Sequence, residues 1–170
     1  MTSFPTDRFS DVLAGNDDYA ARFTAEDLTG RAVKGLAIVT CMDSRIVPLA
    51  AVGMNNGDVK ILRNAGARVT DDVLRTLVLA AYLLGVERVL VMPHTDCKMA
   101  SATEEQIHDT IRDQFGVETS SLEFRTVDDQ EAALAYDVRR IRNFPLLPAG
   151  LVVAGAVYDV RTGRLHPRDV

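Results

Sequence analysis

The sequence predicts an α/β fold, with helices flanking a mostly parallel β-sheet of about four to five strands. Short apolar, β-branched runs alternate with longer helical patterns along the chain, which is typical of parallel sheets. The two clearest runs, at 36–40 and 89–93, lack polar alternation, so we expect strands that are buried on both faces. A chain of 170 residues with 47% apolar content is long enough for one sizeable core, which predicts a single domain over residues 35–170.

The predicted elements follow one another without a linker, a repeat or a low-complexity segment. Strands are expected at 35–40, 58–62, 88–92 and 151–160, with a short tail strand after the turn at 161–164. Helices are expected at 46–52, 71–84, 102–115 and 128–143. Thr70 is a favourable N-cap for the helix at 71–84. That helix is so apolar that we expect it to be buried on more than one face.

Residues 1–34 precede the first core strand and are predicted to form an N-terminal helical arm. Two short amphipathic helices fit there, at 7–14 and 17–23. Their apolar face is too small to form a core of its own, so the arm should pack on the main body or on a partner chain. The sequence leaves open which of the two it covers.

The composition argues against several partners and locations. The net charge is −5, the pI is about 5.2, and Lys and Arg form no long run, so we expect no binding to nucleic acid or to a membrane surface. Residues 1–10 do not resemble a signal peptide, and no apolar stretch is long enough to span a bilayer. The expected location is therefore the cytoplasm, where cysteines are better explained as metal ligands or free thiols than as a disulfide.

The two cysteines of the sequence each follow a predicted strand. Cys41 comes directly after the first strand, and the run at 89–93 leads into His94 and Cys97. Because the carboxyl ends of parallel strands meet at one edge of a sheet, we expect these three side chains to lie close together. Thiolates and a neutral imidazole suit Zn²⁺, and three protein ligands leave a fourth position for water, as in catalytic sites. We therefore interpret Cys41, His94 and Cys97 as the ligands of one zinc ion per chain.

Other interpretations of these residues are weaker. Two buried core cysteines beside an ordinary histidine are common, but here both cysteines end strands, with Asp43 and Arg45 next to one of them. A nucleobase deaminase needs His-x-Glu and Pro-Cys-x-x-Cys motifs and a zinc dehydrogenase needs Gly-x-Gly-x-x-Gly, all of which are absent from the sequence. A structural zinc site needs a fourth protein ligand. His108 and His166 are the candidates, but both lie in polar stretches, where we expect solvated side chains.

Asp43 and Arg45 form either an ordinary turn salt bridge or a functional pair. In the functional interpretation, Arg45 keeps Asp43 ionised and oriented, because a nearby cation lowers the pKa of a carboxyl group. Asp43 then accepts a hydrogen bond from the zinc-bound water or hydroxide and orients its lone pair. If Asp43 loses Arg45, it swings onto the metal as a fourth ligand and closes the site.

Three motifs together resemble the β-class carbonic anhydrases, in particular their compact bacterial and archaeal members. The motifs are Cys41-x-Asp43-x-Arg45, Arg63-Asn64-Ala65-Gly66 and His94-Thr95-Asp96-Cys97, in this order and at these separations. The resemblance implies zinc on Cys41, His94 and Cys97, with Asp43 and Arg45 as the catalytic pair. It also implies a homodimer, or a tetramer built from dimers, with active sites near the subunit interface and an N-terminal arm that wraps the partner.

The activity that this resemblance implies is reversible hydration of the small-molecule substrate CO₂ to bicarbonate and a proton, by attack of zinc-bound hydroxide. Two alternatives stay open: a carbonyl sulfide or carbon disulfide hydrolase on the same scaffold, and a non-catalytic protein that binds zinc and bicarbonate or a partner. The chain departs from the family at Lys98, where the family usually has Gly. It also contains no Trp, so the tryptophan-containing bicarbonate regulatory pocket of some members is not expected.

Overall fold

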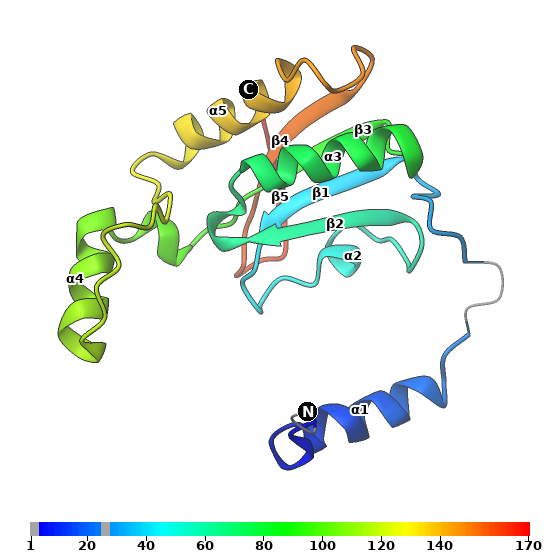
Figure 1. The fold of residues 1–170 in the computed structure, drawn as a ribbon. Coiled ribbons are helices and arrows are strands. Elements are labelled where there is room, and N and C mark those ends of the chain that lie inside the picture. The colour runs from blue at the N-terminus through cyan, green and yellow to red at the C-terminus, as the bar shows by residue number, and fades with distance from the viewer. Residues whose placement is uncertain (1–3, 25–27) are drawn as a thin grey trace.

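A computed structural model describes residues 4–24 and 28–170, and a five-stranded sheet forms its centre (Figure 1). The strands are β1 (Leu36–Cys41), β2 (Val59–Asn64), β3 (Arg88–Met92), β4 (Val152–Tyr158) and β5 (Leu165–Arg168). Their order in the sheet is β2-β1-β3-β4-β5, in which the first four are parallel and β5 pairs antiparallel with β4. The α/β class, the mostly parallel sheet and the tail strand are therefore confirmed.

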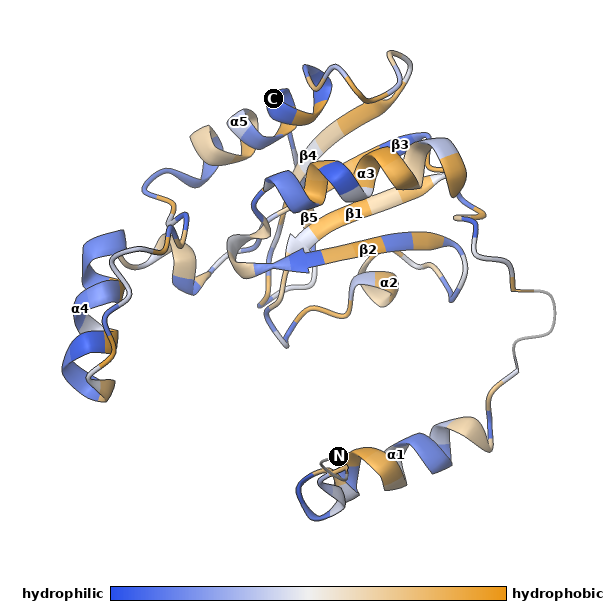
Figure 2. Cartoon of the chain, viewed as in Figure 1, coloured by the Kyte–Doolittle hydropathy of each residue, from blue (hydrophilic) through white to orange (hydrophobic). Residues whose placement is uncertain are grey.

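Two long helices cover one face of the sheet, and a short helix lies on the other (Figure 1). The helices are α1 (Ser10–Ala20), α2 (Pro48–Ala51), α3 (Asp71–Leu83), α4 (Glu104–Phe115) and α5 (Gln130–Arg142). α3 and α5 pack on one face, where Val39 of β1 meets Leu77 and Val138 in one apolar cluster. On the opposite face, Ile38 belongs to a second cluster with Ile46, which precedes the short helix α2. The apolar run of β1, orange in Figure 2, is thus buried on both faces, as predicted. In β3 the prediction holds except at Leu90, which is only partly buried.

Side-chain caps set where three of the helices begin. The Thr70 side chain accepts the N–H of Val73 at 3.3 Å, which confirms the predicted cap of α3. Thr103 caps α4 in a reciprocal arrangement with Gln106, and Asp129 caps α5. α4 and α5 therefore begin two residues later than predicted, because a capping residue has a non-helical backbone.

In the described part of the arm, a short 3₁₀ turn at Thr6–Arg8 and the single α-helix α1 take the place of the two short helices that the sequence predicts. α1 runs through Gly15, which costs only about 1 kcal/mol in a helix interior and is therefore too weak a signal to divide it. α1 stands away from the sheet (Figure 1), and the apolar side chains of the arm are exposed: Phe9, Val12, Leu13, Tyr19 and Phe23. Residues 1–3 and 25–27 of the predicted arm lie outside the described residues.

The prediction that α3 is buried on more than one face is wrong for the single chain. Its buried residues are Val73, Leu74, Leu77 and Ala80, which face the sheet. Three large apolar side chains of its outer side are exposed: Leu79, Tyr82 and Leu83. They lie beside the exposed Asp72–Arg75 ion pair, and the described residues of the chain supply a packing layer on the other side of the helix only. Within the two described ranges, no helix combines the length and the apolar character that crossing a membrane requires.

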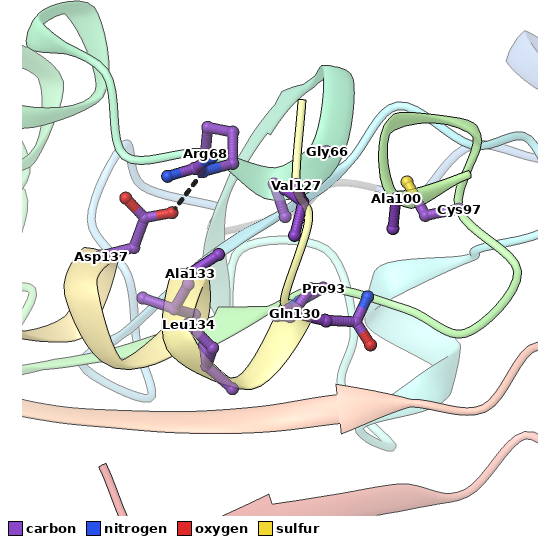
Figure 3. Close-up of a pocket in the computed structure, with 12 residues that line it drawn as sticks. Gly66, Arg68, Pro93, Cys97, Ala100, Val127, Gln130, Ala133, Leu134 and Asp137 are labelled. Atoms are coloured by element: carbon purple, nitrogen blue, oxygen red, sulfur yellow. Dashed lines mark hydrogen bonds and ion pairs between the residues drawn. The ribbon is translucent and has the colours of Figure 1, made fainter. Parts of the chain in front are cut away.

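A buried ion pair joins α5 to the turn after β2 (Figure 3). Nε of Arg68 donates to Oδ2 of Asp137 at 2.7 Å, and 14% and 4% of the two side chains are exposed. The Asn64 side chain stabilises the same turn through two hydrogen bonds to the main chain of Arg68. Its Oδ1 accepts from the Arg68 N–H at 2.8 Å, and its Nδ2 donates to the Arg68 carbonyl at 2.7 Å. α5 therefore holds the 64–68 turn, which reaches the carboxyl edge of the sheet.

Replacing Asp137 with alanine is expected to lower the free energy of unfolding by about 3–5 kcal/mol, because Arg68 is left as a buried, unpaired charge. Urea unfolding followed by circular dichroism measures the loss. Asp72→Ala is the matched control, since Asp72 pairs with Arg75 while 75% and 74% of their side chains are exposed. That control should lose at most about 1 kcal/mol. An equally small loss for Asp137→Ala would contradict the stabilising role of the buried pair.

Candidate metal centre

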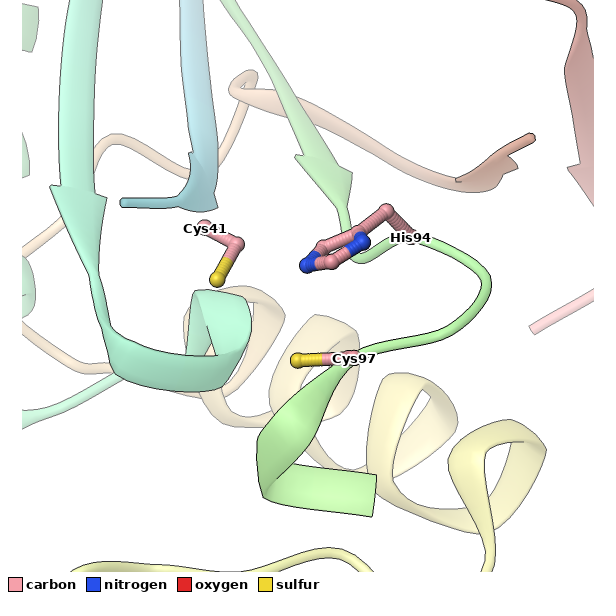
Figure 4. Close-up of side chains that lie close together, drawn as sticks. All are labelled: Cys41, His94 and Cys97. Carbon is pink, nitrogen blue, oxygen red and sulfur yellow. The ribbon is translucent and has the colours of Figure 1, made fainter. Parts of the chain in front are cut away.

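Cys41, His94 and Cys97 lie together at the carboxyl edge of the sheet (Figure 4). β1 and β3 are neighbours in parallel register, with Thr40 opposite Met92, so the two strands end side by side. Cys41 is the last residue of β1, and β3 leads directly into the loop that carries His94 and Cys97. The ligand atoms of the three side chains all lie within 4.8 Å of one another, and all three residues are buried. The structure therefore brings together the residues that the strand ends predicted to meet.

His94 is oriented to bind a metal through Nε2. Its Nδ1 lies 2.8 Å from the carbonyl oxygen of Thr95, and since a carbonyl can only accept, Nδ1 carries the proton. Nε2 then presents a lone pair, and among the described residues this buried atom has no hydrogen-bond partner. A histidine whose other ring nitrogen donates to a carbonyl is the usual arrangement in metal sites. Gln130 of α5 steadies the loop, because its side-chain amide donates to the carbonyl of His94 at 2.9 Å.

The Cys97 thiol lies in surroundings that disfavour its ionisation. Burial raises the pKa of the Cys97 thiol and the neighbouring Cys41 raises it further, although the main-chain N–H groups of Met99 and Ala100 oppose the shift. The N–H of Gly66 donates to Sγ of Cys41 at 3.4 Å. Two thiolates and a neutral imidazole are a donor set that suits Zn²⁺ and balances its charge. The residues that are present therefore fit a zinc ion.

Asp43 and Arg45 form a two-pronged ion pair beside these three residues. Nε and Nη2 of Arg45 donate to the two carboxylate oxygens of Asp43 at 3.0 and 2.8 Å, and the Arg45 main-chain N–H adds a third bond of 2.9 Å. These bonds hold the pKa of the Asp43 carboxyl well below its usual range, although partial burial works in the opposite direction. Oδ2 of Asp43 lies 3.8 Å from Nε2 of His94. Asp43 is thus ionised, fixed and directed towards the candidate metal position.

Arg63 and Gly66 support the site, although the sequence motif that contains them assigned them no role. Nε and Nη2 of Arg63 donate to the carbonyls of Cys41 and Asp43, at 2.9 and 2.6 Å, which fixes the loop between those two residues. Gly66 has a φ of +76°, and a Cβ there would lie 3.1 Å from the Cβ of Met99. Glycine therefore suits this turn better than any residue with a side chain. A glycine a few residues after a predicted strand is the sequence signal that marks such a turn.

The other histidines lie apart from the three candidate ligands. His166 is exposed, as predicted, but the prediction of a solvated His108 is wrong. The His108 side chain is 14% exposed, its Nδ1 pairs with the hydroxyl of Thr119 at 2.8 Å, and its ring packs on Phe124. The polar pattern of α4 was misleading because the segment that follows α4 folds back on it. Lys98, where the chain departs from the family pattern, is an exposed residue.

A small cavity lies behind Cys97, between the 64–68 turn and α5 (Figure 3). Its lining includes Gly66, Cys97, Gln130 and the Arg68–Asp137 ion pair. Its volume is about 10 Å³, which is room for about one water molecule.

A mostly parallel sheet carries a buried Cys-His-Cys group at its carboxyl edge, next to a fixed carboxylate, and these three residues could hold a metal ion. This is the arrangement of an α/β enzyme with its site at the ends of the strands. A sequence model of the carbonic anhydrase family matches residues 36–165. The chain belongs to the β-carbonic anhydrases, which confirms the family that the three motifs predicted.

Three relatives show how close the likeness is. The chain is 36% identical to β-carbonic anhydrase 1 of Mycobacterium tuberculosis over 157 residues, which cover 92% of this chain and 94% of the relative. Its structure is similar to that of a carbonic anhydrase from Streptococcus mutans, with a TM-score of 0.87, 35% identity, and coverage of 98% and 99%. It is also 29% identical to a carbon disulfide hydrolase of Acidithiobacillus thiooxidans over 152 residues, which cover 78% and 76%. Identity and coverage are thus higher for the two carbonic anhydrases.

Proposed function

We propose that this chain catalyses the reversible hydration of carbon dioxide to bicarbonate and a proton, as a zinc-dependent carbonic anhydrase. The observation that carries the proposal is the position of Asp43, whose carboxylate is held by Arg45 and lies 3.8 Å from Nε2 of His94, an atom to which no described residue is hydrogen-bonded. A protein that only bound zinc or bicarbonate would not need an oriented, ionised carboxylate beside its metal ligands. Membership of the family supports the same activity.

Cys41, His94 and Cys97 would hold one zinc ion per chain, since their donor atoms converge within 4.8 Å. A zinc ion there supplies the Lewis acidity that makes hydroxide available near neutral pH, an effect best known from carbonic anhydrases with three histidine ligands. The protein keeps the donors in place. The Thr95 carbonyl orients the His94 ring, and the Gly66 N–H stabilises negative charge on Cys41.

In this proposal Asp43 orients the attacking water or hydroxide. Because Arg45 keeps Asp43 ionised, the carboxylate accepts a hydrogen bond and cannot donate one. The nucleophile therefore directs its proton at Asp43 and its lone pair at the carbon of CO₂. A carbon–oxygen bond forms between hydroxide and CO₂, and bicarbonate leaves. The proton comes from the O–H bond that the next water molecule breaks when it supplies hydroxide, and this proton passes to buffer. Arg45 does not contact the substrate in this scheme, and its part is to fix Asp43.

The oligomer and the location complete the proposal. A homodimer, or a tetramer built from dimers, would cover the apolar side chains that the single chain leaves exposed on the arm of residues 1–34 and on α3. The arm would pack on the partner subunit, which accounts for its small contact with its own sheet. A cytoplasmic location is consistent with two free, buried cysteines, because a reducing compartment keeps them available as ligands.

Parallel assays on one zinc-loaded preparation test the proposal: stopped-flow hydration of CO₂, and release of hydrogen sulfide from carbonyl sulfide and carbon disulfide. Fast CO₂ hydration with slow sulfide release is expected. Fast sulfide release without CO₂ hydration would place the chain with the carbon disulfide hydrolases instead. Zinc binding without turnover of any of the three substrates would identify a non-catalytic zinc protein.

A further inference from the structure

The Arg45 guanidinium connects the two loops that carry the candidate metal ligands. Towards the first loop it makes the two-pronged ion pair with Asp43. Towards the second loop, Nη1 donates to Oδ2 of Asp96 at 2.7 Å and Nη2 donates to the carbonyl oxygen of Asp96 at 3.0 Å. Cys41 lies in the first of these segments, and Asp96 stands between His94 and Cys97 in the second. One side chain therefore ties both parts of the site together without any metal.

Asp96 has an unusual backbone conformation at the point where it contacts Arg45. Its φ is +57°, in the left-handed region that most residues with a Cβ avoid and that Asp and Asn tolerate best. Both its carboxylate and its main-chain carbonyl meet the Arg45 guanidinium. Glycine would adopt the same backbone more readily but has no carboxylate to offer. The presence of Asp at this position therefore points to a role for its side chain.

Arg45 needs a second anchor because of where Asp43 lies. Oδ2 of Asp43 is 3.8 Å from Nε2 of His94, so a carboxylate that is not held in place could become a ligand of a metal bound by His94. The Arg45 side chain is 44% exposed and that of Asp96 is 61% exposed, so either ion pair alone would be a weak restraint. A guanidinium that bonds two carboxylates and a carbonyl is fixed in plane and in direction, which makes the restraint much firmer.

We propose that Asp96 is a positioning residue, which acts through Arg45 to hold Asp43 off the metal and so keeps the site open to water and substrate. This inference rests on the proposed function, since it concerns the metal that Cys41, His94 and Cys97 would bind. Asp96 does not contact the reacting atoms in this scheme. Asp96 instead favours the state in which Asp43 stays off the metal over the state in which Asp43 binds the metal and closes the site.

Cobalt substitution tests this role through a signal other than activity. Co²⁺ replaces zinc in the purified protein, and visible absorption reports the ligands of the metal, alongside CO₂ hydration by the zinc form. Asp96→Gly keeps the left-handed backbone but removes the carboxylate, and Asp96→Asn keeps both the backbone and an acceptor oxygen. Asp72→Asn, in the exposed pair with Arg75, is the control for loss of a surface carboxylate.

We expect Asp96→Gly to shift the cobalt spectrum towards a site with a carboxylate ligand and to lower kcat about tenfold, with a smaller effect for Asp96→Asn. The control should match the unmodified protein in both readouts. Adding Asp43→Ala to Asp96→Gly should abolish the spectral shift, because the proposed new ligand is then absent.

Two results would overturn the role of Asp96 while leaving the proposed function intact. One is an unchanged cobalt spectrum in both Asp96 variants. The other is a spectral shift that survives Asp43→Ala, which would mean that Asp96 merely supports the loop. An unmodified protein that binds neither cobalt nor zinc would instead overturn the proposed function, and the role of Asp96 with it.

Discussion

Replacement of Cys41 with serine is expected to remove the zinc and to reduce CO₂ hydration by about 10³-fold or more. A serine hydroxyl stays protonated at neutral pH, so the site loses one of the two negative charges that balance the metal. Zinc content by mass spectrometry and hydration by stopped flow measure the two losses on the same sample. Cys97→Ser should behave in the same way, because both thiols belong to one ligand group.

His166→Ala is the control for this experiment, since His166 is an exposed histidine outside the ligand group. It should keep its zinc and its activity. Circular dichroism should show that the serine variants keep the fold, because the sheet and both apolar clusters are built mainly from other residues. A Cys41→Ser protein with about one zinc per chain and full turnover would contradict the ligand assignment.

Replacement of Arg45 with alanine is expected to keep the zinc but to lower kcat by about 10²-fold, because Asp43 loses the groups that fix its carboxylate. Arg45→Lys should lower kcat almost as much. An ammonium group retains the positive charge, but it lacks the planar set of donors that reaches both carboxylate oxygens of Asp43 and also Asp96. Zinc content and kcat are again the two readouts. Arg75→Ala, in an exposed Arg–Asp pair of α3, is the matched control and should change neither. Full turnover by Arg45→Ala would contradict this role and would mean that Arg45 and Asp43 form an ordinary salt bridge without a function in catalysis.

The central part of the fold could be predicted because its signals are local and strong. The apolar runs that became β1 and β3 have no polar alternation, so few other structures could bury them. The arm and α3 were predicted less well for a different reason. Their apolar side chains require a covering layer, and a sequence does not say whether that layer comes from the same chain. Helix starts were misplaced by two residues where Thr103 and Asp129 act as caps.

The candidate ligands could be predicted because adjacent parallel strands bring their carboxyl ends to one edge, which is a rule of topology rather than of side-chain detail. The groups that hold the ligands could not be predicted in this way. Arg45 meets Asp96 across 51 positions of the sequence, and Gln130 meets the His94 carbonyl across 36. Such contacts depend on the conformation of individual loops, including the left-handed backbone of Asp96.

A zinc titration tests the central claim most directly. The metal is removed with a chelator at mildly acidic pH, zinc is added back in steps, and bound zinc and CO₂ hydration are measured at each step. The proposed site predicts that hydration rises in proportion to bound zinc and stops rising at about one zinc per chain. Hydration that is independent of zinc, or zinc that binds fully without restoring hydration, would contradict the assignment of Cys41, His94 and Cys97 as the catalytic metal site.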